Sequence, residues 1–355
     1  MRLALTGFLL DDSGYGEAAR RLLAAARFAG LECSVGTLLT DGETCRGPES
    51  RSLVAELSLQ QGPAPDAHIL VMAATDFQAV AKDDGARRVG LTCWETDRLH
   101  PDFAAGLERA DLVLAPSEHN LRLFSKVRPA ALVPFPVRVP PLEEMEVPSE
   151  LADVSASTHV FYSIGSWQER KNPIGLLTAY LTGFTGQEDV LLVLKTGPAG
   201  AARTALSQFQ ALQERLALPD PPPVKILTGQ WPAERVWGLH RRGACYVSMS
   251  RGEAFGLPLL DAAAIGNRVI APDWGGQVDF LRDAPRWRPV STRLVPVAQK
   301  YAYFRGDQLW ADPDIVEARE QMRWAATCSE EKDAPSLERF SIGAVADALR
   351  EALRG

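Results

Sequence analysis

The chain has 355 residues, of which 46% are hydrophobic and 23% are charged, an ordinary composition for a water-soluble protein long enough for two domains. Its formal net charge is −7 and no cluster of lysines and arginines is longer than a pair, so nucleic acid or an anionic lipid surface is a poor partner for it. No apolar run approaches the roughly 18 residues that a membrane-spanning helix requires, so membrane association is at most peripheral.

The cysteines and the first residues indicate the compartment. Cys33, Cys45, Cys93, Cys245 and Cys328 are scattered, odd in number and form no C-x-x-C pair, which favours neutral thiols in a reducing compartment over a disulfide framework or a zinc site. The opening MRLALTGFLLDDSG has one basic residue and two aspartates, and it lacks the cleavage pattern of a signal peptide. We therefore expect a cytoplasmic protein that binds no metal.

Short apolar runs alternate with helical patterns through the first 150 residues. Strands of four to seven apolar residues separated by helices indicate a parallel sheet buried on both faces, so we expect an α/β lobe here. The strands are predicted at 2–8, 33–38, 68–73, 89–93, 112–115 and 131–134, and the helices at 17–29 and 120–126.

A proline-rich segment, VPFPVRVPPLEEMEVPSELADVSAST (133–158), follows and has little periodicity, so we interpret it as an interdomain linker. The alternation then begins again, which indicates two Rossmann-like lobes with a cleft between them, at 1–150 and 151–337. A helix within the final segment, 338–355, is expected to return to the first lobe. The second-lobe strands are predicted at 159–165, 190–197, 224–229, 245–250 and 268–273, and the helices near 201–218 and starting at Pro173, Pro232 and Pro258.

A glycine-rich turn lies at the start of the first predicted helix, where Gly14 and Gly16 match the dinucleotide fingerprint G-x-G-x-x-[GA]. Its context fits poorly, because Asp11 and Asp12 would repel a pyrophosphate. The first carboxylate beyond the second strand, Asp41, also lies further along than the roughly 20 residues expected. Three interpretations stay open: the NAD(P) site of an oxidoreductase, a turn that binds nothing, and a loop that approaches a ligand held mainly by the second lobe.

The segment 248–276 is predicted to form a strand, a loop, a helix and a further strand. Glu253 lies in the loop at the carboxyl end of the strand, where open α/β sheets bind ligands. Asp261 lies about one turn into the helix and its side chain leans toward the helix N-terminus, so the two carboxylates face one crevice. Between them, free backbone N–H groups at 255–257 form an anion site. This arrangement suits a ligand with sugar hydroxyls, phosphate and ribose, and the alternative is a capped helix with two solvated acids.

A basic pair lies near the start of the second lobe. After the strand, Gly165 and Ser166 form a turn, and Arg170 and Lys171 precede a helix whose first residue is Pro173. Adjacent cations at the end of a strand and the mouth of a helix can clamp a diphosphate, whereas a basic pair on its own is usually surface charge.

The stretches GSWQERKNP (165–173) and GEAFGLPLLDAAAIGNRVIAPDWGG (252–276) together resemble the retaining GT-B glycosyltransferases with the E-x(7)-E signature, the group 1 or family 4-like enzymes. The resemblance is strong over 161–281 and weaker in the first lobe. It implies hexose transfer from a UDP- or GDP-sugar to a carbohydrate or glycolipid acceptor, with retention of configuration and no metal or other cofactor. Such enzymes act in polysaccharide, glycolipid or glycoconjugate synthesis.

The resemblance also implies a role for each matching residue. Glu253 would hold the hydroxyls of the donor sugar, Asp261 the ribose hydroxyls, and Arg170 and Lys171 the diphosphate, so that Glu253, Arg170 and Lys171 are the expected catalytic residues. The expected donor-binding residues are Gly14, Gly16, Gly165, Ser166, Lys195, Thr196, Gly229, Gln230, Phe255, Gly256, Leu257 and Asp261.

The sequence departs from the family pattern at two places. Asp261 stands where the family has a glutamate, so it must lie closer to the hydroxyls it binds. The family's first-lobe histidine has no counterpart, because the segment WETD (94–97) occupies its place. A Trp94 packed in the core and a Glu95 that caps a loop are the alternative to contact with substrate. A sugar-binding or scaffold protein without turnover is a further alternative. The acceptor-side candidates are Tyr15, Trp94, Glu95 and Asp97.

Overall fold

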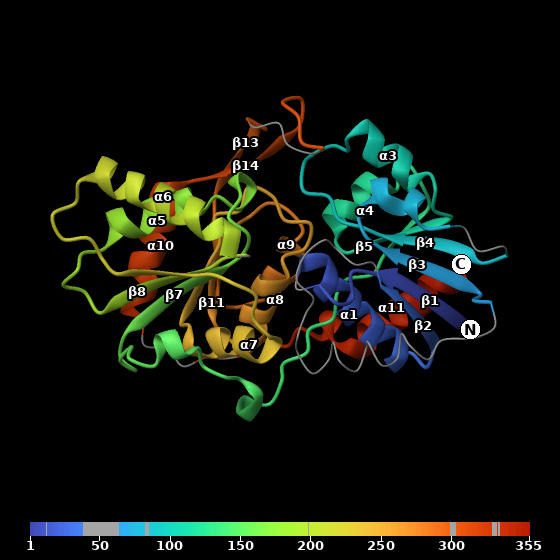
Figure 1. The fold of residues 1–355 in the computed structure, drawn as a ribbon, viewed down its shortest axis with the longest axis horizontal. Coiled ribbons are helices and arrows are strands. Elements are labelled where there is room, and N and C mark those ends of the chain that lie inside the picture. Colours follow the sequence, from blue (N-terminus) through green and yellow to red (C-terminus); the bar gives the residue numbers. More distant parts are fainter. Residues whose placement is uncertain are drawn as a thin grey trace.

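The structure is a computed structural model that describes residues 1–11, 13–37, 64–81, 85–197, 199–298, 303–328, 332 and 334–355, without the side chains of 199–201. Asp12, Asp41 and Cys45 lie outside the described residues. The described chain forms two α/β lobes side by side, each built on a six-stranded sheet (Figure 1).

The predicted strands of the first lobe are all present, within one or two residues of their expected ends. The helix α3 was not predicted, because it is short and its first turn consists of a histidine cap and a proline. The elements of this lobe are β1 (Arg2–Gly7), α1 (Gly14–Phe28), β2 (Glu32–Thr37), β3 (Ala67–Val71), η1 (Ala74–Ala79), β4 (Arg87–Leu91), α3 (Pro101–Leu107), β5 (Leu112–Ala115), α4 (Glu118–Phe124) and β6 (Ala130–Leu132).

The strands of the first sheet are parallel and follow the order β2-β1-β3-β4-β5-β6. In the centre, Leu5 lies in register with Val35 on one side and Ile69 on the other, and all three are buried. The order reverses between β1 and β3, so the carboxyl ends of these strands form a topological switch point, the place where open α/β sheets bind ligands. The glycine turn that follows β1 lies at this point.

The second lobe contains every strand predicted for it and several elements that were not predicted: β12, α9, α10 and a hairpin. Its elements are β7 (His159–Ile164), η4 (Glu169–Lys171), α5 (Pro173–Gly183), β8 (Val190–Lys195), α6 (Ala199–Leu216), β9 (Val224–Leu227), α7 (Ala233–Arg242), β10 (Cys245–Val247), α8 (Leu257–Ala264), β11 (Arg268–Pro272), α9 (Val278–Leu281), β12 (Trp287–Val290) and α10 (Ile315–Thr327).

The second sheet is also parallel, with the order β12-β11-β10-β7-β8-β9. This is the strand order of the dinucleotide-binding Rossmann fold, in which the reversal falls between the first and fourth strands, here β7 and β10. The loops that follow β7 and β10 therefore lie next to each other at the switch point of this sheet. α10 packs against α5, an association of distant segments that periodicity alone does not reveal.

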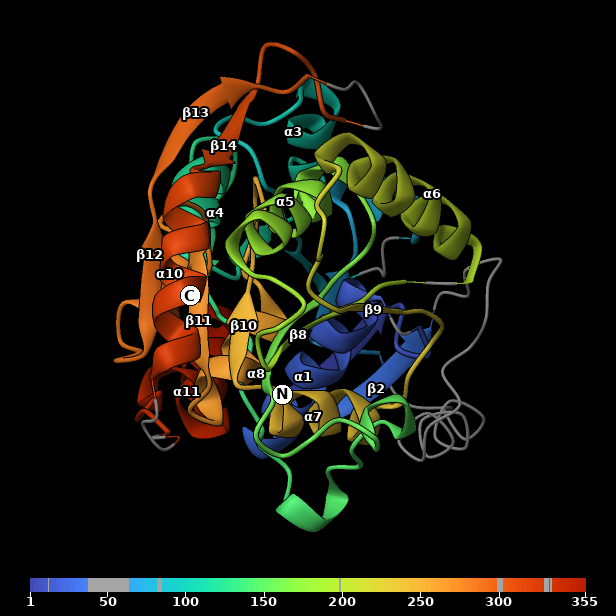
Figure 2. The same cartoon turned by 90° about the vertical axis from the view of Figure 1, so that its left-hand side faces the viewer.

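The hairpin of β13 (Thr292–Pro296) and β14 (Leu309–Pro313) extends from the second lobe to the first. Figures 1 and 2 show it at the same edge of the molecule as α3. The backbone N–H of Leu309 donates to Asp97 Oδ1 at 2.6 Å, and the N–H of Asp97 donates to the carbonyl of Leu309 at 3.0 Å. Phe304 stacks on Trp94 with ring centroids 5.6 Å apart. The hairpin thus joins the lobes at one edge of their junction.

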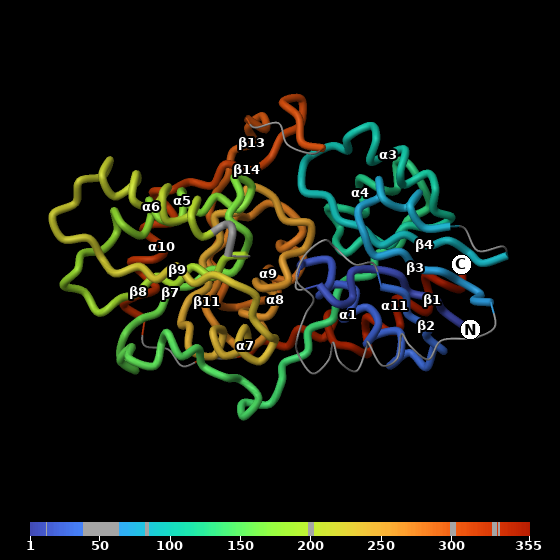
Figure 3. Tube along the Cα trace, in the orientation of Figure 1, coloured from blue at the N-terminus to red at the C-terminus, as the bar shows by residue number. Residues whose placement is uncertain are grey.

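Two further segments connect the lobes, the linker and the C-terminal region (Figure 3). The linker contains the short turns η2 (Leu142–Glu144) and η3 (Ser149–Leu151), and the chain returns through η5 (Glu338–Phe340) to α11 (Ile342–Arg354). The buried residues of α11, Val345, Ala346, Leu349 and Leu353, recur with helical spacing. This face packs on α1, and Arg350 Nε donates to the carbonyl of Ala29 at 2.9 Å.

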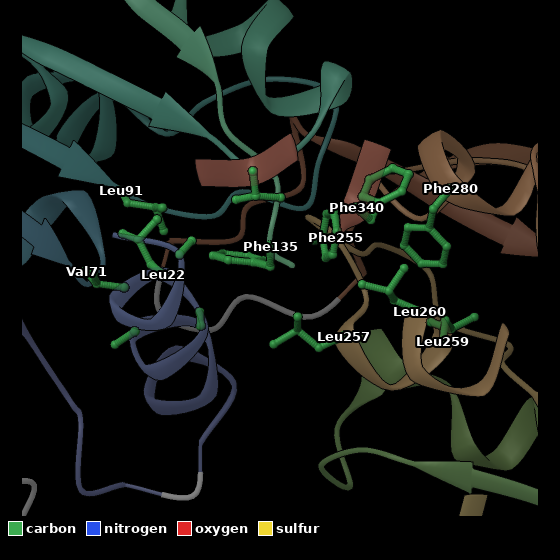
Figure 4. Close-up of a cluster of buried hydrophobic side chains, with 14 of the residues drawn as sticks. Leu22, Val71, Leu91, Phe135, Phe255, Leu257, Leu259, Leu260, Phe280 and Phe340 are labelled. Carbon is green, nitrogen blue, oxygen red and sulfur yellow. The ribbon is translucent and has the colours of Figure 1, made fainter. Parts of the chain in front are cut away.

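An apolar cluster continues from one lobe into the other (Figure 4). Leu22 of α1 and Leu91 of β4 lie on the first-lobe side, and Phe255 and Phe280 on the second. Phe135 of the linker lies between them, with its ring 5.2 Å from that of Phe255 at an interplanar angle of 89°. The lobes therefore share a buried core beside α1 and α8, which resists their separation because separation would expose apolar surface.

Truncation of the linker ring tests this shared core. Phe135→Ala should lower the free energy of unfolding by about 3 kcal/mol, because Phe135 is 1% exposed and its loss leaves a cavity between the lobes. Denaturant titration followed by fluorescence and circular dichroism measures the change. Val139→Ala, at an exposed position of the same linker, is the control and should change little. An unaltered midpoint for Phe135→Ala would show that the lobes do not depend on this contact.

Candidate active site

The three residues predicted to be catalytic meet at the switch point of the second sheet. Arg170 and Lys171 follow β7, Glu253 follows β10, and these two strands are neighbours. Lys171 Nζ lies 2.6 Å from Glu253 Oε1, and Arg170 Nη1 lies 3.7 Å from Glu253 Oε2. Arg170 Nη1 also donates to the carbonyl of Gly252 at 2.5 Å. The arrangement places two cations and a carboxylate where a Rossmann-like sheet binds its ligand.

The local sequence determines the position of Arg170 and Lys171 just before the N-terminus of α5. Asn172 adopts a left-handed conformation, φ 49°, which asparagine tolerates better than most residues. Its side-chain oxygen accepts the N–H of Gly175 and caps α5, and Pro173 occupies the first helical position. The chain therefore turns sharply after Lys171, which keeps the pair beside the end of β7.

Glu253 is 7% exposed, so its charge is stabilised by partners and not by water. Burial opposes ionisation, but Lys171 and Arg170 outweigh it and hold the pKa of this carboxyl below its usual range. Glu253 is thus a carboxylate at neutral pH, able to accept hydrogen bonds from sugar hydroxyls.

The first lobe contributes Glu95 to the same cluster. Glu95 Oε1 lies 3.3 Å from Arg170 Nη2, and both side chains are mostly buried. A Cβ on Gly252 would lie 2.2 Å from the carbonyl oxygen of Glu95, so only glycine allows the two loops to approach this closely. Four charged side chains, Glu95, Arg170, Lys171 and Glu253, therefore form one network across the lobe junction.

A small cavity of about 30 Å³ adjoins this network. Such a volume admits ordered water but not a nucleotide, so a nucleotide bound in this cavity would require its lining side chains to move. Among the described residues, the buried Thr196 Oγ1 in its wall has no hydrogen-bond partner. Lys195 Nζ donates to the carbonyls of Thr196 and Gly229 at 2.9 and 2.8 Å. The predicted site residues that line the cavity are Gly165, Ser166, Lys171, Lys195, Thr196 and Glu253.

A larger cavity of about 620 Å³ lies next to the small one and was not predicted. Trp167 and Pro173 line both, and the indole N–H of Trp167 donates to Gln208 Oε1 at 2.8 Å. Gln168, Glu169 and Arg251 also line it. In the sequence, the only sign of this cavity was Trp167, a tryptophan among polar residues beside the basic pair. That sign predicts no cavity unless the position of α6 is known.

Asp261 lies away from this network, in a buried ion pair with the first lobe. Arg21 of α1 donates from Nη1 to Asp261 Oδ1 at 2.9 Å and from Nη2 to Oδ2 at 2.6 Å. Arg21 Nε also donates to Glu17 Oε1 at 2.6 Å. Both oxygens of Asp261 are thus engaged, and a ribose hydroxyl would have to share them with Arg21. Sequence reasoning missed Arg21, because only the fold brings it to Asp261.

The glycine turn has a structural explanation of its own. Ser13 caps α1 by accepting the N–H of Gly16. A Cβ on Gly16 would lie 2.0 Å from the carbonyl oxygen of Asp11, whereas one on Gly14 would meet no atom within 4 Å. Close packing in the turn therefore requires glycine only at Gly16. Tyr15 lies against the first-lobe loop, with its hydroxyl accepting the N–H of Cys93 at 3.2 Å.

The acceptor-side candidates separate in the structure. Trp94 is 2% exposed, packs on Phe103 with centroids 4.5 Å apart and stacks on Phe304, so it has the packed role that the sequence left as its alternative. Asp97 binds the hairpin. Glu95 alone of the segment 94–97 joins the charged network.

The remaining predicted residues lie at or just before the start of α8 and after β9, and none of them lines the small cavity. Gly256, with φ 93°, precedes α8 in a conformation that glycine adopts readily, and Phe255 packs into the shared core. Leu257 begins α8. Gly229, with φ 95°, and Gln230 follow β9.

The structure also bears on three further features that the sequence raised: the cysteines, metal binding and membrane-spanning helices. The cysteines in the described part, Cys33, Cys93, Cys245 and Cys328, form no disulfide with one another, and burial raises the pKa of the Cys93 and Cys245 thiols. No group of three or more His, Cys, Asp and Glu side chains in the described ranges is arranged to hold a metal ion. No helix within those ranges combines the length and the apolar character needed to cross a bilayer.

Comparison with known proteins gives a match in structure but none in sequence. No protein-family model matches the chain, and no curated protein matches it. Anabaena HepE, solved in complex with UDP and glucose, matches with a TM-score of 0.59 and 13% identity over 100% of this chain and 95% of that one. An α,α-trehalose-phosphate synthase (UDP-forming) from Burkholderia xenovorans, in complex with glucose-6-phosphate, matches with a TM-score of 0.63 and 12% identity over 100% of both chains.

A sucrose-phosphate synthase from Thermosynechococcus elongatus matches with a TM-score of 0.60 and 16% identity over 100% of this chain and 94% of that one. At such identities the likeness concerns the fold. The predicted fold class, α/β with two Rossmann-like lobes of the GT-B kind, is confirmed.

A double-mutant cycle tests the ion pair between Arg21 and Asp261. Arg21→Met should lower the free energy of unfolding by about 3 kcal/mol, because it leaves Asp261 buried without its cation. Adding Asp261→Leu should restore most of the loss, since no charge is then buried. Chemical denaturation measures Arg21→Met, Asp261→Leu and the double variant, with the exposed Arg122→Met as control. Equal losses in the single and double variants would contradict the pairing.

The acid stability of the same cluster follows from Glu17. Burial opposes its ionisation, but Arg21 and Arg20 outweigh it and lower the pKa of Glu17 to about 2. The folded pKa lies below the unfolded one, so this stabilisation is present above about pH 4.5 and is lost as the pH falls toward 2. When the pH falls from 5 to 3, the free energy of unfolding should decrease by about 1 kcal/mol less in Glu17→Gln than in the unaltered protein. This value is discounted because Glu17 is partly exposed. In the control Glu108→Gln, at an exposed position, the free energy of unfolding should decrease between pH 5 and 3 as much as in the unaltered protein.

Proposed function

We propose that the chain is a glycosyltransferase that moves a hexose from a UDP- or GDP-sugar to a carbohydrate or glycolipid acceptor, with retention of configuration and without a metal. The observation that carries the proposal is the meeting of Glu253, Arg170 and Lys171 at the switch point of the second sheet. The unpartnered buried hydroxyl of Thr196 beside them supports a polar ligand at this place. The printed descriptions of the similar structures, which name UDP and glucose or glucose-6-phosphate, support the choice of donor and acceptor.

In this proposal the second lobe holds the donor. Lys171 and Arg170 bind the diphosphate, because adjacent cations suit its paired negative groups. Glu253 accepts hydrogen bonds from the hydroxyls of the donor sugar. Lys195, Thr196 and the adjacent turn of Gly229 and Gln230 bind the nucleoside part of the donor.

The reaction breaks the bond between the anomeric carbon and the diphosphate oxygen. Negative charge grows on that oxygen, and Arg170 and Lys171 stabilise it more strongly in the transition state than in the ground state. The acceptor hydroxyl attacks from the face that the diphosphate leaves, forming the new glycosidic bond. The leaving phosphate oxygen takes the acceptor's proton, so atoms and charges balance without a protein nucleophile.

The close packing of the two lobes serves this chemistry by excluding water, which would otherwise hydrolyse the donor. The scattered thiols support a cytoplasmic location, and the role we propose is in polysaccharide, glycolipid or glycoconjugate synthesis. Asp261 contributes to ribose binding if it shares its oxygens between Arg21 and the hydroxyls.

A donor screen that detects released nucleoside diphosphate tests the function directly. One UDP- or GDP-sugar should be turned over in the presence of a sugar acceptor. Arg170→Ala should reduce kcat roughly 30- to 1000-fold, because one charge-assisted contact to the leaving group contributes about 2–4 kcal/mol. Glu253→Ala should likewise abolish transfer, and the exposed Glu108→Gln should not.

Thermal shift separates this function from its competitors. UDP or GDP should raise the melting temperature and NAD should not, because the packing of the turn already accounts for the glycine at position 16 without a cofactor. Stabilisation by NAD alone would favour the oxidoreductase. Stabilisation by UDP or GDP without turnover of any donor would favour a binding protein.

A further inference from the structure

The charges around the basic pair are already balanced within the protein. Arg170 and Lys171 supply two positive charges, and Glu95 and Glu253 supply two negative ones. A diphosphate that approaches Arg170 therefore meets a neutral cluster, and it must replace a carboxylate to gain the full attraction of the cation.

The two carboxylates are not equivalent partners of Arg170. Glu253 has Lys171 at 2.6 Å and keeps that partner when Arg170 turns away. For Glu95, Arg170 is the one cation within ion-pair distance in the described part of the chain, at 3.3 Å. Glu253 also lies further from Arg170, at 3.7 Å. The contact between Glu95 and Arg170 is thus the one that a ligand on Arg170 has to break.

The position of Glu95 is set by the backbone. Its carbonyl oxygen lies so close to Gly252 that a Cβ there would approach it to 2.2 Å. Arg170 in turn donates to the carbonyl of Gly252. The close contact thus holds the backbone of Glu95 near Arg170, and its carboxylate can leave the guanidinium by a change of side-chain rotamer alone.

We propose that Glu95 is a positioning residue that holds Arg170 and competes with the diphosphate of the donor for it. The idea rests on the proposed function, because it assumes a nucleoside diphosphate at this site. Phosphate takes the place of the carboxylate on the guanidinium, next to Lys171 and Glu253, which line the small cavity. Because Glu95 competes for Arg170, it lowers the affinity for nucleoside diphosphate and thereby speeds the release of this product. The exchange also couples ligand binding to a contact between the lobes.

Calorimetric titration of UDP, GDP and inorganic pyrophosphate tests the competition. Glu95→Gln should bind each of them roughly 5- to 20-fold more tightly, because the competing charge is gone while the shape is kept. Uridine, which has no phosphate, should bind with unchanged affinity. Asp97→Asn is the matched control: it removes one negative charge from the same loop, but Asp97 contacts Leu309 and not Arg170. Its affinity should stay within roughly twofold of the unaltered protein.

A double-mutant cycle assigns the effect to Arg170. In an Arg170→Met background, Glu95→Gln should change diphosphate affinity less than roughly twofold, because the residue competed for is absent. Glu95→Asp keeps the charge but shortens its reach, so it should give an intermediate gain. It also serves as the second variant if Glu95→Gln does not fold.

The outcomes separate the inference from the function. If the unaltered protein binds UDP, GDP or pyrophosphate and Glu95→Gln binds them no more tightly, the competition is refuted and the proposed function stands. Equal gains for Glu95→Gln and Asp97→Asn would mean a general field effect and would also refute it. If none of the three ligands binds the unaltered protein, both proposals fail. A gain specific to Glu95→Gln in a protein that transfers no sugar would support the competition and overturn the transferase.

Discussion

Charges buried at the junction of two lobes have to be paired, and this constraint shapes the molecule. An ionised side chain removed from water is strongly unfavourable unless an opposite charge or hydrogen bonds compensate it. The second lobe places Glu253 and Asp261 at the junction with 7% and 5% exposure. Each carboxylate has a cationic partner at 2.6 Å, Lys171 in one case and Arg21 in the other. The site and the joint between the lobes are therefore parts of one electrostatic arrangement.

The two clusters differ in what they can do. The pair of Arg21 and Asp261 is bidentate and lies beside the apolar core that the lobes share, so it fixes their relative position. The cluster around Arg170 is looser, because Arg170 lies 3.7 Å from Glu253 and because Lys171 and Glu253 line a cavity. A rigid joint next to a rearrangeable charged cluster is the arrangement that a site with a polyanionic ligand requires, since the ligand replaces charges without separating the lobes.

Local patterns in the sequence were sufficient for every strand of the two large sheets except β12, and for the meeting of the basic pair with Glu253. The parallel strands are buried on both faces, so they appear as continuous apolar runs, and proline and glycine mark the helix ends at Pro173 and Pro258. The basic pair and Glu253 could be brought together because both follow strands, and strands of one parallel sheet end at one edge. The hairpin could not be predicted, because polar residues and prolines interrupt its alternation and its contacts are with Trp94 and Asp97, far away in the chain.

What the sequence could not supply is the identity of partners across the junction. Glu17 and Arg21 are recognisable as an i, i+4 pair on a helix, but nothing local indicates that Arg21 also binds Asp261. The same limit applies to Glu95, for which contact with substrate and a structural role both fitted its loop. In the structure its carboxylate is neither free for a substrate nor a cap of its own loop, because it lies against a cation of the opposite lobe. In the proposed exchange, Glu95 pairs with a buried cation in one state, and phosphate replaces it in another. Such a residue has to contact the cation without blocking the access of phosphate. A single 3.3 Å contact with Arg170 meets this requirement.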